Sequence, residues 1–252
     1  MLPHRVDALK IANVGAVNLA NNHILDYRYE GALETLSVLD QAGIKHCGVG
    51  RTLSEARAVS VVERNGVRIG FLGATDHPEG WEARAGTPVG CAMIDTDARP
   101  KECAAWLVTR IQEVRSTVDI LVVCLHWGPN WHEDRHFIDN VMMPVSQMLV
   151  DAGADVIHGT SSHHVLPIRV MQSKSDSARS GLVVLGQGDL LDDYDQHPRN
   201  FDSRTGAALR NDIGVLVKAH FSRSDDDSQW KFERFETFPT RIEAADHVEL
   251  LK

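Results

Sequence analysis

Three short segments of the chain combine side chains that could bind a metal ion or transfer a proton. The first holds Asn21, Asn22 and His23, with Asp26 close behind, and follows a strand predicted over Val14 to Ala20. An amide oxygen can bind a hard divalent ion, and a nearby histidine can donate or accept a proton. Asparagines also shape turns and cap helices, so a purely structural role for this segment is an open alternative.

The second segment is His126-Trp127-Gly128, which ends the apolar run DILVVCL over residues 119–125. By its position, His126 should face the crevice at the end of this strand. Imidazole nitrogen suits zinc, iron, nickel and manganese to varying degrees. A core histidine held by a carbonyl group is an equally good interpretation.

The third segment holds three histidines within seven residues, His158, His163 and His164, directly after a predicted strand. Gly159 lets the backbone turn sharply there. Such a loop can aim imidazoles and hydroxyls at one point, which makes it the most specific of the three signals. An ordinary polar turn is the alternative.

Two further groups lie close to predicted strands. Asp189 follows the strand predicted over Leu182 to Gly186, and Asp192 and Asp193 come soon after. Carboxylates there could bind a metal or orient a histidine. Arg210, which precedes the next strand, could clamp a carboxylate or a phosphate group, although a surface ion pair is the simpler interpretation.

The elements that must position these residues alternate along the chain. Apolar residues at helical spacing, followed by Gly43, predict a helix over Glu30 to Ala42. Asn65-Gly66 between two β-rich runs predicts a hairpin. The remaining predicted elements are helices at residues 6–12, 102–114 and 139–152, and strands at 119–125, 155–158, 213–220 and 230–238, the last at a sheet edge.

This order predicts an α/β fold, with a mixed sheet flanked by helices. Polar residues at the carboxyl ends of strands are the expected site positions in such a sheet. No segment is typical of an interdomain linker, so we expect a single domain over residues 1–252.

Composition limits the classes of function. The chain has 252 residues, 43% of them hydrophobic, and a formal net charge of −9, which disfavours nucleic acid as a partner. A small or polymeric anionic substrate fits if a bound metal reverses the local field. The four cysteines form no CxxC pair and no apolar run is long enough for a membrane span, so we expect a cytoplasmic protein with reduced thiols.

Four segments together resemble the CapA family of bacterial poly-γ-glutamate capsule proteins. They are LANNHILDYRYEGALETLSVLDQAGI, LHWGPNW, LVDAGADVIHGTSSHHVLPIRV and GQGDLLDDY, in that order, and the resemblance runs from about Val6 to about Val217. It implies a four-layer αββα sandwich like that of the metallophosphoesterases, with a divalent metal (Mn, Zn or Fe) at the strand ends.

The resemblance also implies roles for individual residues. Asn22 and His126 would bind metal, as would His158 and His163 in the third segment. His23 would donate a proton to the leaving group. Asp189 is a second candidate for proton transfer. The candidates for substrate contacts are Asn21, Asp26, Trp127, His164 and Arg210.

The chain departs from the family pattern in two places. Relatives commonly carry histidine where this chain has Thr160, and a hydroxyl is a much poorer ligand than imidazole. Family members usually begin with a strand ending in Gly-Asp, followed by a further acidic motif, and this chain starts after both. We therefore expect either a fragment or a fold that lacks the usual first strand and some ligands.

Three functions fit these observations. The first is a metal-dependent hydrolase of a phosphoester or of an amide such as a γ-glutamyl bond. The second is a metal-independent acid/base enzyme, such as an isomerase or epimerase, that uses the same histidines and Asp189. The third is a non-catalytic component that handles an anionic polymer.

Overall fold

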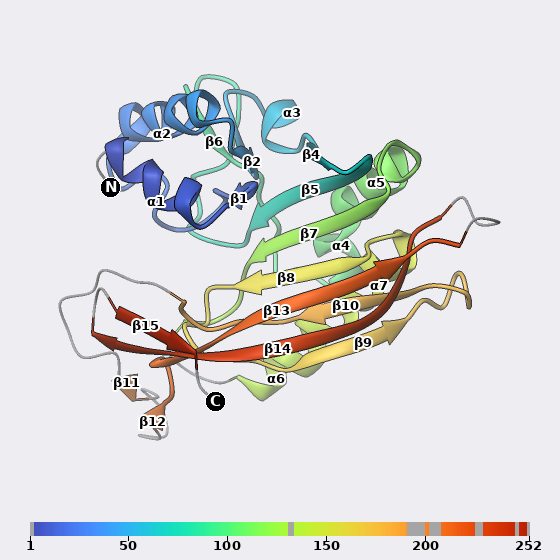
Figure 1. Cartoon of the computed structure of the whole chain (residues 1–252). Helices are drawn as coiled ribbons and strands as arrows, with labels where there is room; N and C mark the ends of the chain where they lie inside the picture. Colours follow the sequence, from blue (N-terminus) through green and yellow to red (C-terminus); the bar gives the residue numbers. More distant parts are fainter. Residues whose placement is uncertain are drawn as a thin grey trace. The chain divides into compact units, whose positions relative to one another are not determined.

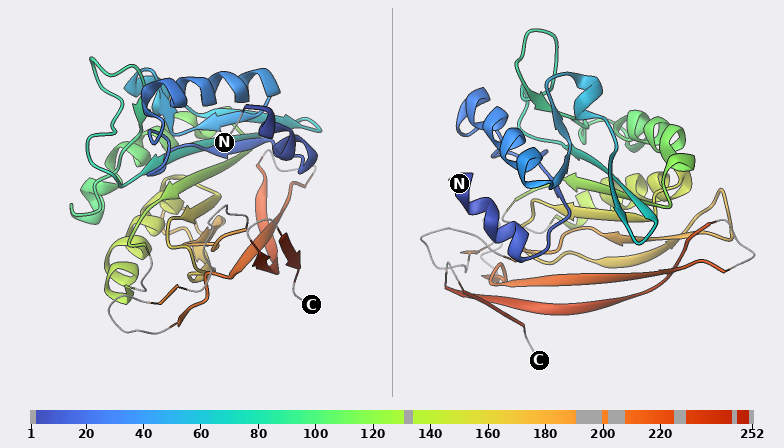
Figure 2. Two further views of the ribbon diagram at one scale, coloured as in Figure 1. Left: turned by 90° about the vertical axis from the view of Figure 1, so that its left-hand side faces the viewer. Right: turned by 45° about the horizontal axis from the view of Figure 1, so that its top comes forward.

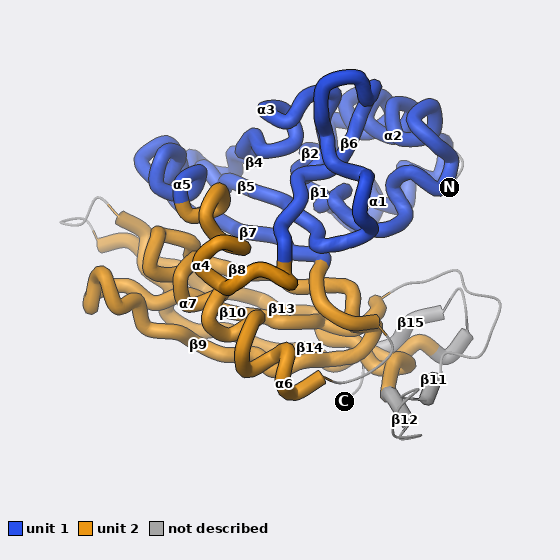
Figure 3. The backbone as a smooth tube through the Cα atoms, turned by 180° about the vertical axis from the view of Figure 1, so that it is seen from behind, with its two compact units in different colours: residues 1–95, 109–126 blue, residues 96–108, 127–252 orange. Residues whose placement is uncertain are grey.

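The computed structural model describes residues 3–130, 134–190, 200–201, 208–224, 229–244 and 247–250. Two compact units are distinguished in Figure 3. Unit 1 holds Met1–Asp95 and Thr109–His126, and unit 2 holds Thr96–Val108 and Trp127–Lys252. The expected single domain stays a prediction.

The four predicted helices occur close to their predicted positions, and shorter helical turns accompany them. Together they are η1 (Pro3–Arg5), α1 (Val6–Ile11), α2 (Arg28–Ala42), α3 (Leu53–Ala56), α4 (Pro100–Cys103), α5 (Ala105–Val114), η2 (Arg115–Thr117), α6 (Arg135–Phe137), the π-helical turn η3 (Ile138–Met142) and α7 (Met143–Ala152). Helix α2 ends at Gly43, as predicted, because this residue adopts a left-handed conformation with φ of 70°.

The strands of unit 1 are β1 (Ala16–Asn18), β2 (Lys45–Cys47), β3 (Val49–Gly50), β4 (Ser60–Arg64), β5 (Val67–Thr75), β6 (Gly90–Cys91) and β7 (Ile120–His126). Those of unit 2 are β8 (Val156–Thr160), β9 (Ile168–Gln172), β10 (Ser180–Val184), β11 (Asn200–Phe201), β12 (Ala208–Leu209), β13 (Ile213–Ser222), β14 (Lys231–Ala244) and β15 (His247–Leu250).

Three strands of unit 1 pair in the order β4-β5-β7 (Figure 1). Strands β4 and β5 form the predicted hairpin, and Asn65 and Gly66 at its turn both have positive φ, at 52° and 75°. This is the backbone that a two-residue turn of this kind requires. Strands β5 and β7 run parallel, with Thr75 opposite His126 at their carboxyl ends.

The rest of unit 1 surrounds a small apolar core. Strands β1 and β2 pair in parallel, and α2 contacts β2. The short helix α1 lies beside α2 (Figure 2). The core of this region consists of buried residues from the turn after β1, from α2 and from the segment around β3 and β6: Ala20, Ala32, Leu36, Val49, Val89 and Cys91.

The described part of unit 2 contains the strands β8, β9 and β10 under a covering helix, the sheet β13-β14-β15 and the short pair β11-β12. Strand β10 pairs in parallel with β8 and antiparallel with β9, and α7 contacts all three strands. The long antiparallel strands β13 and β14 form the second sheet with β15, and β14 contacts β10 (Figure 1). Since β8 and β10 run parallel, the segments that follow them leave the sheet at one edge.

Some boundaries differ from the sequence predictions. The helix predicted over residues 102–114 is divided at Ala104 into α4 and α5. The helix predicted over residues 139–152 begins with the π-helical turn, because Pro144 lacks the N–H that a regular α-helical pattern would use. Strand β14 is longer than expected and pairs with β15 near its end as well as with β13.

The mixed α/β class is confirmed by the parallel and antiparallel strands and their helices. The four-layer arrangement, its likeness to metallophosphoesterases and the missing first strand stay predictions.

Candidate functional site

The clearest polar pair in unit 2 joins His163 to Asp189. His163 lies in the loop after β8, and Asp189 lies in the segment after β10. The histidine Nδ1 is 2.9 Å from Oδ2 and 3.2 Å from Oδ1 of the carboxylate. Both side chains are largely buried. Parallel pairing of β8 and β10 brings together two residues that are 26 positions apart in the sequence.

This pair fixes the orientation of the imidazole. A carboxylate only accepts hydrogen bonds, so Nδ1 of His163 donates its proton to Asp189. In the neutral ring, the lone pair then lies on Nε2, which is the nitrogen that can bind a metal or accept a proton. The arrangement is the one that carboxylates commonly make with metal-binding histidines, and it equally suits proton transfer.

His158 has a different partner. Its Nε2 lies 2.7 Å from Oε1 of Gln187, in the segment after β10. If Gln187 accepts through its oxygen, then Nε2 carries the proton and a metal could be bound only through Nδ1. Gln187 lies in the GQGDLLDDY motif but was given no role there, because only the pairing of β8 with β10 brings it to His158.

Two predicted substrate contacts are core residues in the structure. Trp127 is only 1% exposed and is one of the largest fully buried side chains. His164 is 8% exposed, and its Nδ1 donates to the carbonyl of Ser162 at 2.6 Å. Both residues therefore pack and shape the loop after β8, and their contact with a substrate stays a prediction.

The Asn21 to Asp26 segment of unit 1 forms a partly buried turn between β1 and α2, in which His23 and Asp26 are exposed. Oδ1 of Asn21 accepts a hydrogen bond from the His23 backbone N–H at 2.9 Å, so Asn21 does shape a turn. His23 Nδ1 lies 2.7 Å from Oδ2 of Asp26, and the two side chains are 58% and 48% exposed. Asp26 thus orients His23 in solvent, and Asn22, which lies between Asn21 and His23 in the chain, is half-buried.

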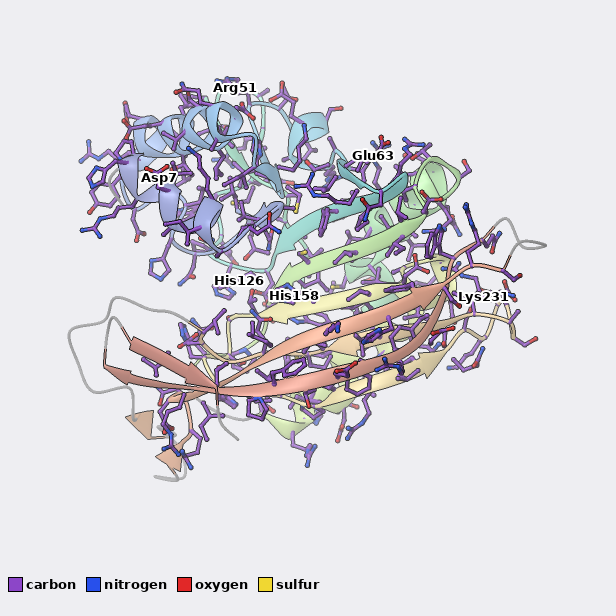
Figure 4. All side chains as sticks on the ribbon, in the orientation of Figure 1. Asp7, Arg51, Glu63, His126, His158 and Lys231 are labelled. Carbon is purple, nitrogen blue, oxygen red and sulfur yellow. The ribbon has the colours of Figure 1, made fainter. Side chains whose placement is uncertain are left out.

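A second histidine lies beside His126 at the ends of β5 and β7. Figure 4 labels His126, at the carboxyl end of β7. The His77 ring centroid is 5.0 Å from that of His126, and the two planes are inclined by 49°. Nδ1 of His77 is hydrogen-bonded to Asp76. Sequence analysis singled out neither Asp76 nor His77, although their position directly after β5 was a usable signal.

Arg210 forms an ion pair with Asp212. Its Nε and one terminal nitrogen lie 2.7 and 2.8 Å from the two carboxylate oxygens. The hydrogen bond to Asp212 raises the pKa of the exposed Arg210 guanidinium. The simpler interpretation of Arg210, an ion pair, therefore describes what the structure contains, and an anion-binding role stays a prediction.

The donor types fit a divalent ion, but the ligand set is incomplete in the described parts of the chain. His163 with Asp189 has the carboxylate-supported imidazole that metal sites use. Within the described ranges, however, no three His, Cys, Asp or Glu side chains are grouped to hold an ion. Asn22 and His126 belong to unit 1, and His158 and His163 to unit 2, so their common pocket stays a prediction. Asp192 and Asp193 lie outside the described residues.

Comparison with known families gives a match over most of the chain. The family model described as bacterial capsule synthesis protein PGA_cap matches residues 1–194. A probable polyglutamine synthesis accessory protein of Mycobacterium tuberculosis (strain H37Rv) is 34% identical over 77% of this chain and 50% of its own length. The PGA biosynthesis protein CapA of Bacillus subtilis (strain 168) is 32% identical over 73% of this chain and 46% of its own.

The predicted resemblance to the CapA family is therefore confirmed. The chain spans about half the length of these curated relatives. A hypothetical protein of known crystal structure from Thermus thermophilus aligns with a TM-score of 0.49 at 10% identity, over 94% of this chain and 80% of that one. Across the residues that the structure describes, none of the helices has the length and apolar character to cross a membrane.

Proposed function

The chain belongs to the PGA_cap family of bacterial capsule synthesis proteins, and from that premise we propose that it is a metal-dependent hydrolase. The bond cleaved would be a phosphoester or a γ-glutamyl-type amide, in a small or polymeric anionic substrate of poly-γ-glutamate or capsule metabolism. The observation that carries this proposal is the His163–Asp189 pair, which holds an imidazole at the edge where β8 and β10 end.

Two histidines, each oriented by a carboxylate and each in a different unit, have separate roles in this proposal. Asp189 directs Nε2 of His163 toward a ligand or a proton, with both side chains largely shielded from water. His23, which is exposed and is held by Asp26, would protonate the leaving group. A divalent ion, when bound, would supply activation of water and polarisation of the bond under attack.

The relatives support the substrate class only through their names. One is named for polyglutamine synthesis and another for PGA biosynthesis. Poly-γ-glutamate carries a carboxylate on each residue, so its cleavage requires a site that tolerates negative charge. A four-layer, metallophosphoesterase-like fold and a cytoplasmic location are further parts of this proposal.

A metal-independent acid/base enzyme, such as an isomerase or epimerase, is the second candidate. It is favoured by the two His–Asp pairs that involve His23 and His163. In each pair the carboxylate binds one imidazole nitrogen and so prepares the other for proton transfer.

The test combines metal analysis with turnover. The purified chain would be assayed for bound Mn, Zn and Fe by elemental analysis. It would then be incubated with poly-γ-glutamate, a γ-glutamyl anilide, and phosphomonoester and phosphodiester reporters, with and without a chelator. His163→Ala and Asp189→Asn would be compared with His220→Ala, a matched control in which another histidine–carboxylate pair of unit 2 is broken.

We expect chelator-sensitive hydrolysis of at least one substrate, lost in His163→Ala and retained in His220→Ala. Epimerised glutamate without bond cleavage, in a metal-free protein, would favour the second candidate. Tight polymer binding without any turnover would instead show a non-catalytic polymer-handling role and overturn the hydrolase proposal.

A further inference from the structure

Asp76 and His77 form a hydrogen-bonded pair that lies outside the sequence motifs and has no role in the proposed function. We propose that His77 and His126 bind the same divalent ion in unit 1, and that Asp76 orients His77 for this purpose. The inference rests on the metal-dependent form of the proposed function. It adds a ligand, His77, that lies outside the four motif segments quoted for the CapA family.

The separation of the two rings suits a shared ion. The centroids of His77 and His126 are 5.0 Å apart. Two imidazoles that each bind one tetrahedral ion at about 2.1 Å would have ring centroids about 5 Å apart. The planes are inclined by 49°, so the rings do not form a parallel stack.

Asp76 decides which nitrogen of His77 can act as the ligand. Its side chain is only 5% exposed and accepts a hydrogen bond from Nδ1 of His77. The lone pair of the neutral ring therefore lies on Nε2. This nitrogen is buried and has no hydrogen-bond partner among the residues that the structure describes. Buried polar atoms rarely lack a partner, and a bound ion would supply one.

The backbone holds the two histidines in place. Thr75 is opposite His126 in the parallel register of β5 and β7. The Asp76 backbone N–H donates to the His126 carbonyl at 3.2 Å. The Thr75 hydroxyl, fully buried, donates to the His77 carbonyl at 2.8 Å. The segment after β5 is thus fastened to the end of β7, which pre-organises the two rings before a ligand arrives.

Metal binding would be measured directly, without an activity assay. The purified chain would be stripped of metal by chelation and titrated with Co²⁺ and Zn²⁺. Calorimetry gives the affinity, and the visible absorption of Co²⁺ reports nitrogen coordination. The variants are His77→Ala, His126→Ala and Asp76→Asn. His46→Ala is the matched control, because it removes another aspartate-paired histidine of unit 1.

We expect His77→Ala and His126→Ala each to weaken binding by about 100-fold or more, and Asp76→Asn to weaken it by about 10–100-fold. The Co²⁺ absorption should change in these variants and stay unchanged in His46→Ala. Circular dichroism would confirm that each variant folds. Asp76→Asn preserves side-chain size, so its metal affinity can be compared with that of the wild type even if His77→Ala does not fold.

Two results would overturn the inference. If His126→Ala lost metal while folded His77→Ala and Asp76→Asn kept wild-type affinity and absorption, His77 would not be a ligand, and the proposed function would stand. If the wild-type chain bound neither ion, the inference and the metal-dependent function would both fall. Metal binding that depends on His77, in a protein that hydrolyses none of the substrates tested, would support the inference and count against the hydrolase.

Discussion

Nδ1 of His163 lies 2.9 Å from Oδ2 of Asp189, and this contact joins the loop after β8 to the segment after β10. The carboxylate determines which nitrogen of the imidazole carries the proton. Asp189, which is 26 positions away in the sequence, therefore determines which nitrogen of His163 can bind a ligand or accept a proton.

Substitution of His163 should reduce turnover more than substitution of Asp189. His163→Ala removes the imidazole, and we expect a loss of about 10²–10⁴-fold, the usual scale for a positioned proton-transfer group. Asp189→Asn keeps the shape but weakens the support, so a loss of about 10–100-fold is expected. The measurement is kcat/KM on a substrate found by the turnover screen. If both variants kept the wild-type kcat/KM, the pair would not be part of the site.

His23→Ala should lower kcat by about 10²–10⁴-fold if His23 protonates the leaving group. The folded state should be little affected, because the His23 side chain is more than half exposed. Added metal should not rescue this variant, whereas it should partly rescue His126→Ala. Full activity of His23→Ala would return Asn21 to His23 to a purely turn-forming role.

Thr160→His should tighten the binding of a transition metal. Thr160 and His158 lie two residues apart in β8, so their side chains point to the same face of the strand. An imidazole nitrogen is a better ligand than a hydroxyl for such ions. Calorimetric titration with Zn²⁺ would compare the variant with the wild type, and an unchanged affinity would argue against a ligand position at residue 160.

Gly159→Ala should destabilise unit 2 because the backbone of Gly159 approaches that of Leu185, directly after β10, too closely for a side chain. A Cβ at this position would lie 2.1 Å from the Leu185 carbonyl oxygen and 2.9 Å from Nε1 of Trp127. Overpacking of this kind costs about 1–3 kcal/mol or more. Chemical denaturation gives the change in the free energy of unfolding.

Gly15→Ala is the matched control for that experiment. The nearest atom to its added Cβ would be a Val62 methyl at 3.6 Å, which is an ordinary contact. We expect this variant to be neutral or more stable by about 0.4–1 kcal/mol, since alanine restricts the unfolded chain. Similar losses in both variants would show that close packing is not the cause.

The cysteine thiols should be unreactive in the folded protein. All four are free and buried. Burial raises the pKa of Cys91 to about 12, and a hydrogen bond with Cys124 together with burial raises the pKa of Cys47. Since the thiolate is the reactive form, a thiol reagent at about pH 8 should modify these residues only after unfolding in denaturant. Rapid modification of the native protein would contradict the described burial.

The sequence alone determined the features that depend on neighbouring residues. Helical spacing followed by Gly43 predicted α2, and Asn65-Gly66 predicted the β4–β5 hairpin. The motifs also led to the CapA family, because they are contiguous segments whose order can be read directly. These signals are local, so they need no knowledge of the folded chain.

Only the tertiary structure decided which polar side chains meet. The pairing of His163 with Asp189 follows from the parallel register of β8 and β10, and the approach of His77 to His126 follows from that of β5 and β7. Burial of Trp127 depends in the same way on packing between distant segments. A one-residue change of register turns every side chain to the other face of a strand, and the residue types near a strand end do not reveal that register.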